Sequence, residues 1–180
     1  MITKLLVLTL LAAAVILTGA YAQGDGAKHA IAVLKNADGE EVGVARFTED
    51  DRGVVLVNVT AEGLPPGYHG IHIHEKGDCT PPFTAAGDHY NPLGKQHGLN
   101  NPQGPHAGDL PDLKVNRAGT GRLNVTTDRV TLSPGPTTLF DADGSAIIIH
   151  AGSDDQMTDP AGNSGGRIAC GVIKRVEATG

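Results

Sequence analysis

Five of the eight histidines in this chain of 180 residues fall between positions 72 and 106. The first two, His72 and His74, stand two residues apart in the run 70–74, Gly-Ile-His-Ile-His. Because the side chains of a strand alternate between its two faces, a strand over this run presents both imidazoles on one face and Ile71 and Ile73 on the other. We therefore expect a strand that packs one face into a core and chelates a metal ion with the other.

Further metal-binding groups lie in or beside the two longest segments without a strand or helix pattern. The segment from Lys76 to Pro111 is rich in Pro and Gly and contains His89, His97, His106 and Asp109. The segment from Ala151 to Gly166 begins directly after His150. Long loops in a compact domain are usually functional, so we expect the first loop to fold over the histidine face and to share metal ions with the strand.

Short alternating or β-branched runs recur between turn signals at residues 30–35, 42–47, 54–60, 68–75, 112–116, 121–127, 145–150 and 167–176. No stretch shows sustained helical periodicity. Trp is absent and aromatic residues make up 3% of the chain, so the core must consist of Val, Ile, Leu and Ala. These features predict one all-β domain, an eight-stranded flattened barrel or immunoglobulin-like sandwich with Greek-key connections and two long functional loops.

The N-terminal segment is typical of a secretory signal. Lys4 precedes an apolar run that ends near Thr18, and Ala20-Tyr21-Ala22 provides a small-x-small cleavage site. The apolar run is shorter than the roughly 20 residues of a membrane-spanning helix. We expect residues 1–22 to be removed and residues 23–180 to form the mature domain. The protein would then be periplasmic or extracellular, with no stable membrane insertion.

Cysteine content and net charge indicate the compartment of the protein and exclude some classes of partner. The two cysteines, Cys79 and Cys170, belong to a chain expected in an oxidising space, where pairing is the default. The formal net charge is −6 at pH 7 and no basic patch is visible. Nucleic acid is therefore not an expected partner.

The candidate ligands divide into two sets by chemistry. His106 and Asp109 are close enough for one turn to present both to one ion, and three histidines with a carboxylate favour a closed tetrahedral zinc site, to which His97 would contribute. Coordination by nitrogen alone favours Cu(II), and the strand-end histidines suit it: His72, His74 and His150. His89 lies between the sets and would bridge the metals if it bound through both ring nitrogens.

The chain resembles the copper/zinc superoxide dismutases over nearly the whole expected mature domain. The segments that carry the resemblance are 70–79 (GIHIHEKGDC), 86–92 (AGDHYNP), His97, 106–109 (HAGD) and 166–173 (GRIACGVI). The resemblance implies a Greek-key barrel, one copper and one zinc per chain, and a disulfide between Cys79 and Cys170. It implies copper held by His72, His74, His89 and His150, and zinc held by His89, His97, His106 and Asp109.

The resemblance also implies an activity, the conversion of superoxide to oxygen and hydrogen peroxide by alternate reduction and oxidation of copper. In that family pattern His89 carries a proton and Arg167 guides the anion, which matters because the overall charge is negative. Asp154 matches the carboxylate that holds the outer nitrogens of His72 and His97, although Asp155 could also fill the role. The loop 151–166 resembles that of exported bacterial members, and a homodimer is left open.

Two other functions compete with this interpretation. One is a non-catalytic copper- and zinc-binding module or metallochaperone-like domain, and the other is an adhesive β-sandwich of the cell envelope. Members without activity would be expected to lack copper ligands or Arg167, and this chain has them all. Of the remaining histidines, His29 is expected at the surface or a strand edge, and His69 in a structural hydrogen bond.

Overall fold

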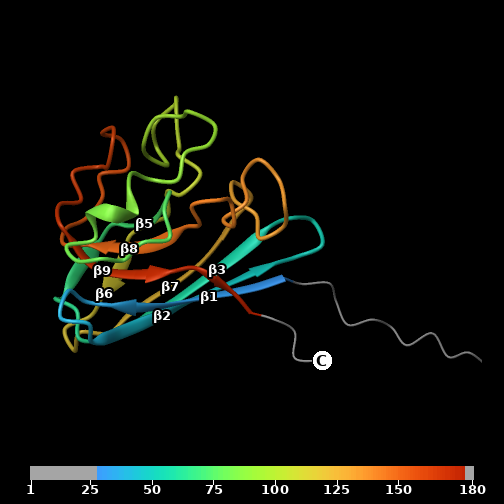
Figure 1. Cartoon of the computed structure of the whole chain (residues 1–180). Helices are drawn as coiled ribbons and strands as arrows, with labels where there is room; N and C mark the ends of the chain where they lie inside the picture. Colours follow the sequence, from blue (N-terminus) through green and yellow to red (C-terminus); the bar gives the residue numbers. More distant parts are fainter. Residues whose placement is uncertain (1–27, 177–180) are drawn as a thin grey trace, which may run out of the picture.

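The computed structural model describes residues 28–176, which form ten strands (Figure 1). The strands are β1 (Lys28–Lys35), β2 (Glu41–Glu49), β3 (Val55–Ala61), β4 (Gly67–His69), β5 (Ile71–His74), β6 (Leu113–Val115), β7 (Gly121–Thr127), β8 (Ala146–His150), β9 (Arg167–Val172) and β10 (Lys174–Arg175). The described part has one helical turn, the 3₁₀ turn η1 (Thr84–Ala86). None of its segments is a helix of the length and hydropathy needed to cross a membrane.

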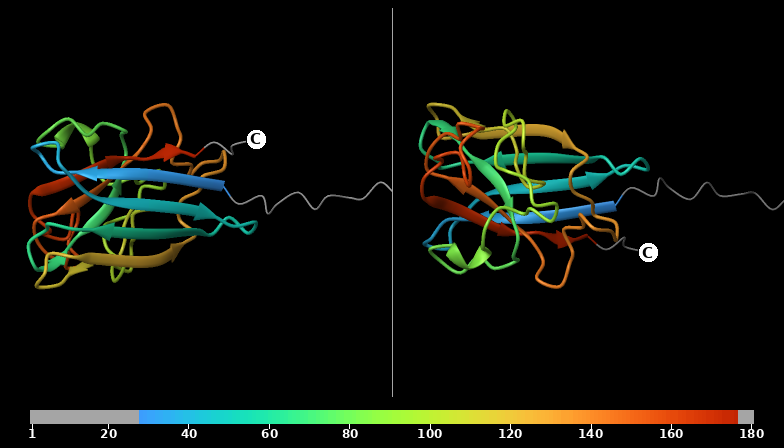
Figure 2. Two further views of the ribbon diagram at one scale, coloured as in Figure 1. Left: turned by 90° about the horizontal axis from the view of Figure 1, so that it is seen from below. Right: turned by 90° about the horizontal axis from the view of Figure 1, so that it is seen from above.

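The strands form one antiparallel sheet that curls into a nearly closed barrel. Its order is β4-β6-β7-β3-β2-β1-β9-β8-β5, with β10 paired to β1. Strands β4 and β5 are consecutive in the chain yet stand at opposite ends of this order, so the sheet must bend around to bring its two edges together. In the left view of Figure 2, β1, β2, β3 and β7 lie side by side across one wall.

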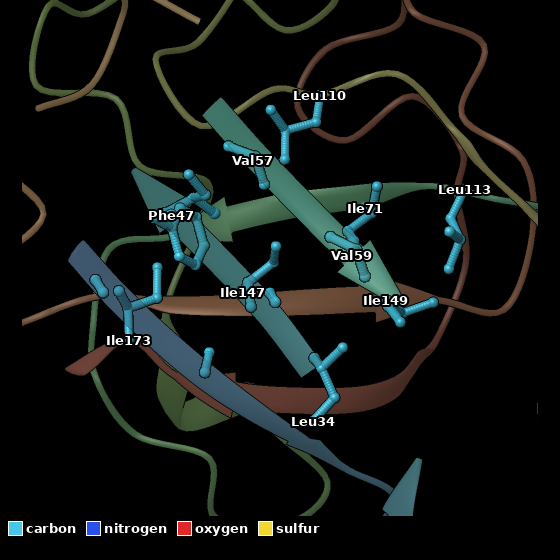
Figure 3. Packing of buried hydrophobic residues seen from close by; sticks show 14 of the residues in the cluster. Leu34, Phe47, Val57, Val59, Ile71, Leu110, Leu113, Ile147, Ile149 and Ile173 are labelled. Carbon is cyan, nitrogen blue, oxygen red and sulfur yellow. The ribbon is translucent and has the colours of Figure 1, made fainter. Parts of the chain in front are cut away.

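The barrel interior is filled by one apolar cluster, mostly aliphatic as predicted but with Phe47 and Tyr90 among its members. Figure 3 shows side chains from both walls meeting there: Leu34, Phe47, Val57, Val59, Ile71, Leu110, Leu113, Ile147, Ile149 and Ile173. Ile71 and Ile73 of β5 are fully buried in this cluster. The expected division of β5 into an apolar face and a histidine face is therefore confirmed.

The all-β barrel prediction is confirmed, but two of the eight predicted strands are each divided. The predicted strand 68–75 breaks at Gly70, which donates its N–H to Gly152 O at 2.8 Å and accepts the His150 N–H at 2.8 Å. The predicted strand 167–176 breaks at Ile173, whose N–H turns to Ser145 O at 2.9 Å. At Gly70 the partner strand changes from β6 to β8, and after Ile173 the chain leaves β8 and stays paired with β1. An alternating pattern gives no indication of either change.

The two long loops lie on the same side of the barrel, beside β5 and β8 (Figure 1). A second apolar cluster packs Phe83 and Ala86 of the first loop onto Ala146, Ile148 and Cys170. All five residues of β8 are consequently buried, because the core covers one face and the loop covers the other. The expected disulfide is present between Cys79 and Cys170, whose Cα atoms are 5.6 Å apart, and it ties the loop to β9.

The predicted signal segment, residues 1–22, lies outside the described residues.

Candidate metal centre

Three histidines line the outer face of β5 and the end of β8, beneath the loops. His72 pairs with Ile148 and His74 with Ala146 in the β5–β8 register, and His150 ends β8. All three side chains are buried. The strand pairing, rather than nearness in sequence, brings His150 beside the other two.

In each of these imidazoles one nitrogen is already engaged. His72 Nε2 donates to Asp154 Oδ2 at 2.7 Å, His74 Nδ1 donates to Gly87 O at 3.0 Å, and His150 Nδ1 donates to Gly165 O at 3.1 Å. Carboxylate and carbonyl oxygens only accept hydrogen bonds, so these nitrogens carry the protons. The opposite nitrogen of each neutral ring therefore has a free lone pair.

The free nitrogens converge with one from the first loop. Each is buried and without a hydrogen-bond partner in the described structure: His72 Nδ1, His74 Nε2, His89 Nε2 and His150 Nε2. The ligand atoms of these four residues all lie within 4.8 Å of one another. Four unpartnered lone pairs in a buried space are costly, and a bound cation would satisfy them. The donor set therefore fits a metal ion.

A second convergence is centred on the carboxylate of Asp109, which is fully buried. Its Oδ1 lies 3.0 Å from His89 Nδ1, 3.1 Å from His97 Nδ1 and 3.5 Å from His106 Nδ1. Its Oδ2 accepts the N–H groups of Gly98 at 2.8 Å and His106 at 2.9 Å. Three imidazole nitrogens thus face one carboxylate oxygen, and His89 belongs to both groups.

A second group of close ligand atoms differs from the expected zinc set in one member. It contains His72, His89, His97 and Asp109, whose ligand atoms lie within 4.8 Å of one another, and it omits His106. However, His72 Nε2 is bonded to Asp154 and its Nδ1 already belongs to the first group. His106 Nδ1 is buried and unpartnered in the described structure. On chemical grounds His106 is the better fourth donor.

Burial keeps most of these rings neutral. It lowers the pKa of His72 to about 3, against the opposing bond from Asp154, and lowers the pKa of His150 to about 4. It also lowers the pKa of His74 and His89. Neutral imidazole is the form that binds metal, so burial prepares these side chains as ligands.

His97 and Asp109 show the opposite behaviour. Burial pushes the pKa of His97 down, but hydrogen bonds to Asp109 and Asp154 outweigh it and raise the pKa to about 9. Burial favours the neutral form of Asp109, yet its close contacts with the imidazoles of His106, His89 and His97 hold its pKa far below the usual range. Without metal this region is a charged cluster in which protons occupy positions that a cation could take.

The open side of the first group is a cavity of about 350 Å³. Its lining includes His74, His89, Lys95, His150, Asp159 and Arg167. Arg167 is half-buried, and its Nη1 and Nη2 donate to Phe83 O and Gly87 O, both at 2.6 Å. A larger cavity of about 560 Å³ lies beside the disulfide, but its lining has no histidine.

Comparison with known proteins decides the family. The sequence model described as copper/zinc superoxide dismutase matches residues 41–173. Superoxide dismutase (Cu-Zn) 2 of Aquifex aeolicus is 49% identical over 146 residues, covering 79% of this chain and 85% of that protein. Superoxide dismutase (Cu-Zn) of Caulobacter vibrioides is 44% identical over 149 residues, covering 81% and 85%, respectively. The chain belongs to the copper/zinc superoxide dismutase family.

The fold agrees with this membership. The crystal structure of a double mutant of a SOD-like protein from Bacillus subtilis has a TM-score of 0.75 to this chain at 45% identity, covering 79% of this chain and 95% of that one. Copper and zinc, the metals of the family, also match the two donor groups, one of nitrogen alone and one with a carboxylate.

The two remaining histidines, His69 and His29, belong to neither group. They are expected in a structural hydrogen bond and at the surface or a strand edge, respectively. His69 is buried and bonds through Nδ1 to His150 O and through Nε2 to Pro65 O, both at 2.8 Å. His29 is exposed on β1, where its Nδ1 lies 3.2 Å from Thr48 Oγ1. Both predictions are confirmed.

The sequence left open whether Asp154 or Asp155 of the second loop contacts His72 and His97. Asp154 is buried and spans the two groups, because its Oδ1 accepts from His97 Nε2 at 2.9 Å while its Oδ2 accepts from His72. Asp155 is exposed and bonds only within its own loop, to Met157, Thr158 and Asn163. Of the two candidates, Asp154 therefore has the expected contacts.

Two further carboxylates near the site were not anticipated. Asp112 accepts from Ser153 Oγ at 2.6 Å and from the Asp154 N–H at 3.0 Å. Asp159 accepts the His97 N–H at 2.6 Å. Its Oδ1 also lies 3.6 Å from His106 Nε2. Neither carboxylate belongs to a recognisable motif, so no sequence signal pointed to them.

Proposed function

We propose that this chain is an exported copper/zinc superoxide dismutase that converts two superoxide anions and two protons to oxygen and hydrogen peroxide. Family membership supports the activity. The single observation that carries the residue assignment is the His89 ring, whose Nε2 is free beside three other free imidazole nitrogens while its Nδ1 faces Asp109.

Copper would be held by His72 through Nδ1 and by His74, His89 and His150 through Nε2. These are the unpartnered buried nitrogens. Zinc would be held by the Nδ1 atoms of His89, His97 and His106 and by Asp109. When bound, copper supplies a one-electron redox couple and zinc supplies positive charge that orders the loops.

The chain's own side chains would bind the anion and handle a proton. Arg167 offers superoxide a permanent positive charge at the cavity, and its two backbone carbonyl contacts fix the guanidinium in place. This local charge matters because the whole chain has a formal net charge of −6. His89 Nε2 is the atom that can hold and release a proton, since its Nδ1 side is fixed against Asp109.

Export would follow from removal of residues 1–22, and the Cys79–Cys170 disulfide fits an oxidising compartment. N-terminal sequencing of the secreted or periplasmic protein tests this step. The expected first residue lies near Gln23, and an uncleaved chain retained in the cytoplasm would contradict it.

The activity is tested by loading the mature protein with copper and zinc and measuring superoxide removal. We expect one copper and one zinc per chain. His72→Ala should abolish nearly all activity, and His29→Ala, which removes an exposed histidine, should not change it. Arg167→Ala should give a partial, salt-sensitive loss, whereas Arg122→Ala on the outer wall should not. Equal activity in all these proteins would refute the proposal.

The same experiment separates the enzyme from a non-catalytic metal-binding module. A module would bind both metals and show no superoxide removal above that of free copper. No observation in the described structure favours that alternative.

A further inference from the structure

Arg129 lies outside every set of residues discussed above, yet it touches the second donor group. It stands two residues beyond the end of β7 and is half-buried. Its Nη2 donates to the backbone carbonyl of Asp109 at 2.6 Å. Its Nε is buried without a hydrogen-bond partner in the described structure. A guanidinium is thus held inside the protein with one donor unsatisfied.

Such an arrangement is costly as a packing solution. Burial lowers the pKa of Arg129, while the negative charges of Asp109 and Asp128 oppose that effect. An apolar side chain could fill the same space without an unpaired donor, so stability alone does not favour arginine here. The hydrogen bond from Arg129 instead holds Asp109 in place.

The contacts of Asp109 show what the arginine adds. The side chain of Asp109 is held by the loop itself, through three imidazoles and two N–H groups. The backbone carbonyl of Asp109 is held from the barrel by Arg129. Asp109 is therefore fixed on two sides, by the loop that carries the ligands and by Arg129 at the end of β7.

We propose that Arg129 is a positioning residue for Asp109, which anchors the carboxylate to the barrel so that the second donor group is formed before the metal arrives. The inference rests on the proposed zinc site at Asp109. Residues that orient a metal ligand typically contribute 10- to 100-fold to metal affinity. A preformed site also constrains the geometry around the ion.

The test measures zinc affinity of the purified mature protein by competition with a chelator, without any assay of activity. Arg129→Met should weaken Zn(II) binding by roughly 10- to 100-fold. Arg129→Lys keeps a positively charged N–H donor but lacks the guanidinium group, so it should bind zinc more tightly than Arg129→Met and less tightly than wild type. The absorption spectrum of Co(II) bound in place of zinc should change in Arg129→Met, because it reports the ligand geometry.

Arg122→Met is the matched control, since Arg122 is an exposed arginine on β7 with no contact to the donor group. It should leave both readouts unchanged. If Arg129→Met fails to fold, Arg129→Gln replaces it on the same two readouts. Wild-type zinc affinity and an unchanged Co(II) spectrum in the folded variant would overturn the inference. Failure of the wild-type protein to bind zinc would instead refute the proposed site.

Discussion

At the scale of residues, four of the proposed ligands are held by the ring nitrogen that would not bind metal: His72, His74, His97 and His150. The sequence could predict the imidazoles, because His72 and His74 have strand spacing, His89, His97 and His106 stand in one loop, and His150 ends an apolar strand. It could not predict most of what orients them, since Gly87 and Gly165 act through backbone carbonyls that any residue possesses. The ligands can therefore be predicted from the identity of the side chains. Which ring nitrogen carries the proton depends on the folded loops.

Asp154 is the orienting group that can be tested by substitution. In Asp154→Asn one carboxylate oxygen becomes an NH2 donor, which faces the N–H of either His72 or His97 and repels it. We expect copper or zinc affinity to fall by roughly 10- to 100-fold, measured by chelator competition. Asp155→Asn should have little effect, because Asp155 is exposed and bonds only within its loop. Equal affinities in the two variants would contradict the assignment.

Glu49 predicts a dependence of stability on pH that is independent of the metals. Its Oε2 accepts the N–H groups of Leu132 and Ser133, both at 2.6 Å, and its Oε1 accepts the Ser133 hydroxyl. Burial raises the pKa of Glu49. The hydrogen bonds from Leu132 and Ser133, together with the positive charge of Lys28, outweigh burial and hold this pKa below its ordinary 4.5. The folded state therefore favours the ionised carboxylate.

The direction of the effect follows. A lowered pKa stabilises the fold fully above pH 4.5, and the contribution is lost as the pH falls through the pKa of the folded state. Glu49→Gln should lower the free energy of unfolding in urea by about 1 to 2 kcal/mol at pH 7. The difference from wild type should shrink and vanish in acid. Glu41→Gln, at the exposed start of β2, is the control, and a constant difference at every pH would contradict the explanation.

At the scale of elements, alternation predicted the strands but not how the barrel closes. The run around Gly70 looks like one strand, yet β4 pairs with β6 and β5 pairs with β8. The choice between those partners depends on the curvature of the whole sheet, which a local pattern cannot encode. The positions of His72 and His74 relative to the core were still correct, because alternation holds within β5 itself.

Gly70 marks the junction because the second loop approaches it closely. A Cβ at Gly70 would lie 2.8 Å from Ser164 Cβ, 3.2 Å from His72 Cε1 and 3.3 Å from Asp154 Cβ. Its backbone φ does not lie in the left-handed region, so steric contact is the main effect of a substitution.

We therefore expect Gly70→Ala to lower the free energy of unfolding by about 1 to 3 kcal/mol. It should also weaken metal binding, because Asp154 and His72 are displaced together. Gly166→Ala is the control, since a Cβ there meets no atom within 4 Å. Calorimetry and chelator competition measure the two effects. A variant with wild-type stability would show that the loop can move away freely.

At the scale of the whole molecule, the apolar core and the donor groups stabilise the fold in different ways. The apolar core needs no metal, whereas the donor groups join the strand face and both loops through buried charged or unpartnered side chains. Metal binding to the native state alone raises stability by mass action, by about 4 kcal/mol when free metal is 1,000 times the dissociation constant.

Chelation should accordingly lower the thermal midpoint of the purified protein. Zinc added alone should restore a large part of the loss, because the Asp109 group holds the first loop to the second through His97 and Asp154. Differential scanning calorimetry of the metal-free, zinc-loaded and fully loaded protein measures this. Identical midpoints in all three would mean that the donor groups do not bind metal in the folded protein.

The account depends most on His89 touching two different ions. The direct measurement is a crystal structure of the oxidised protein loaded with copper and zinc, with anomalous diffraction recorded at both absorption edges. We predict copper at His89 Nε2 together with His72, His74 and His150, and zinc at His89 Nδ1. A single ion, or a His89 ring bound to only one metal, would contradict the account.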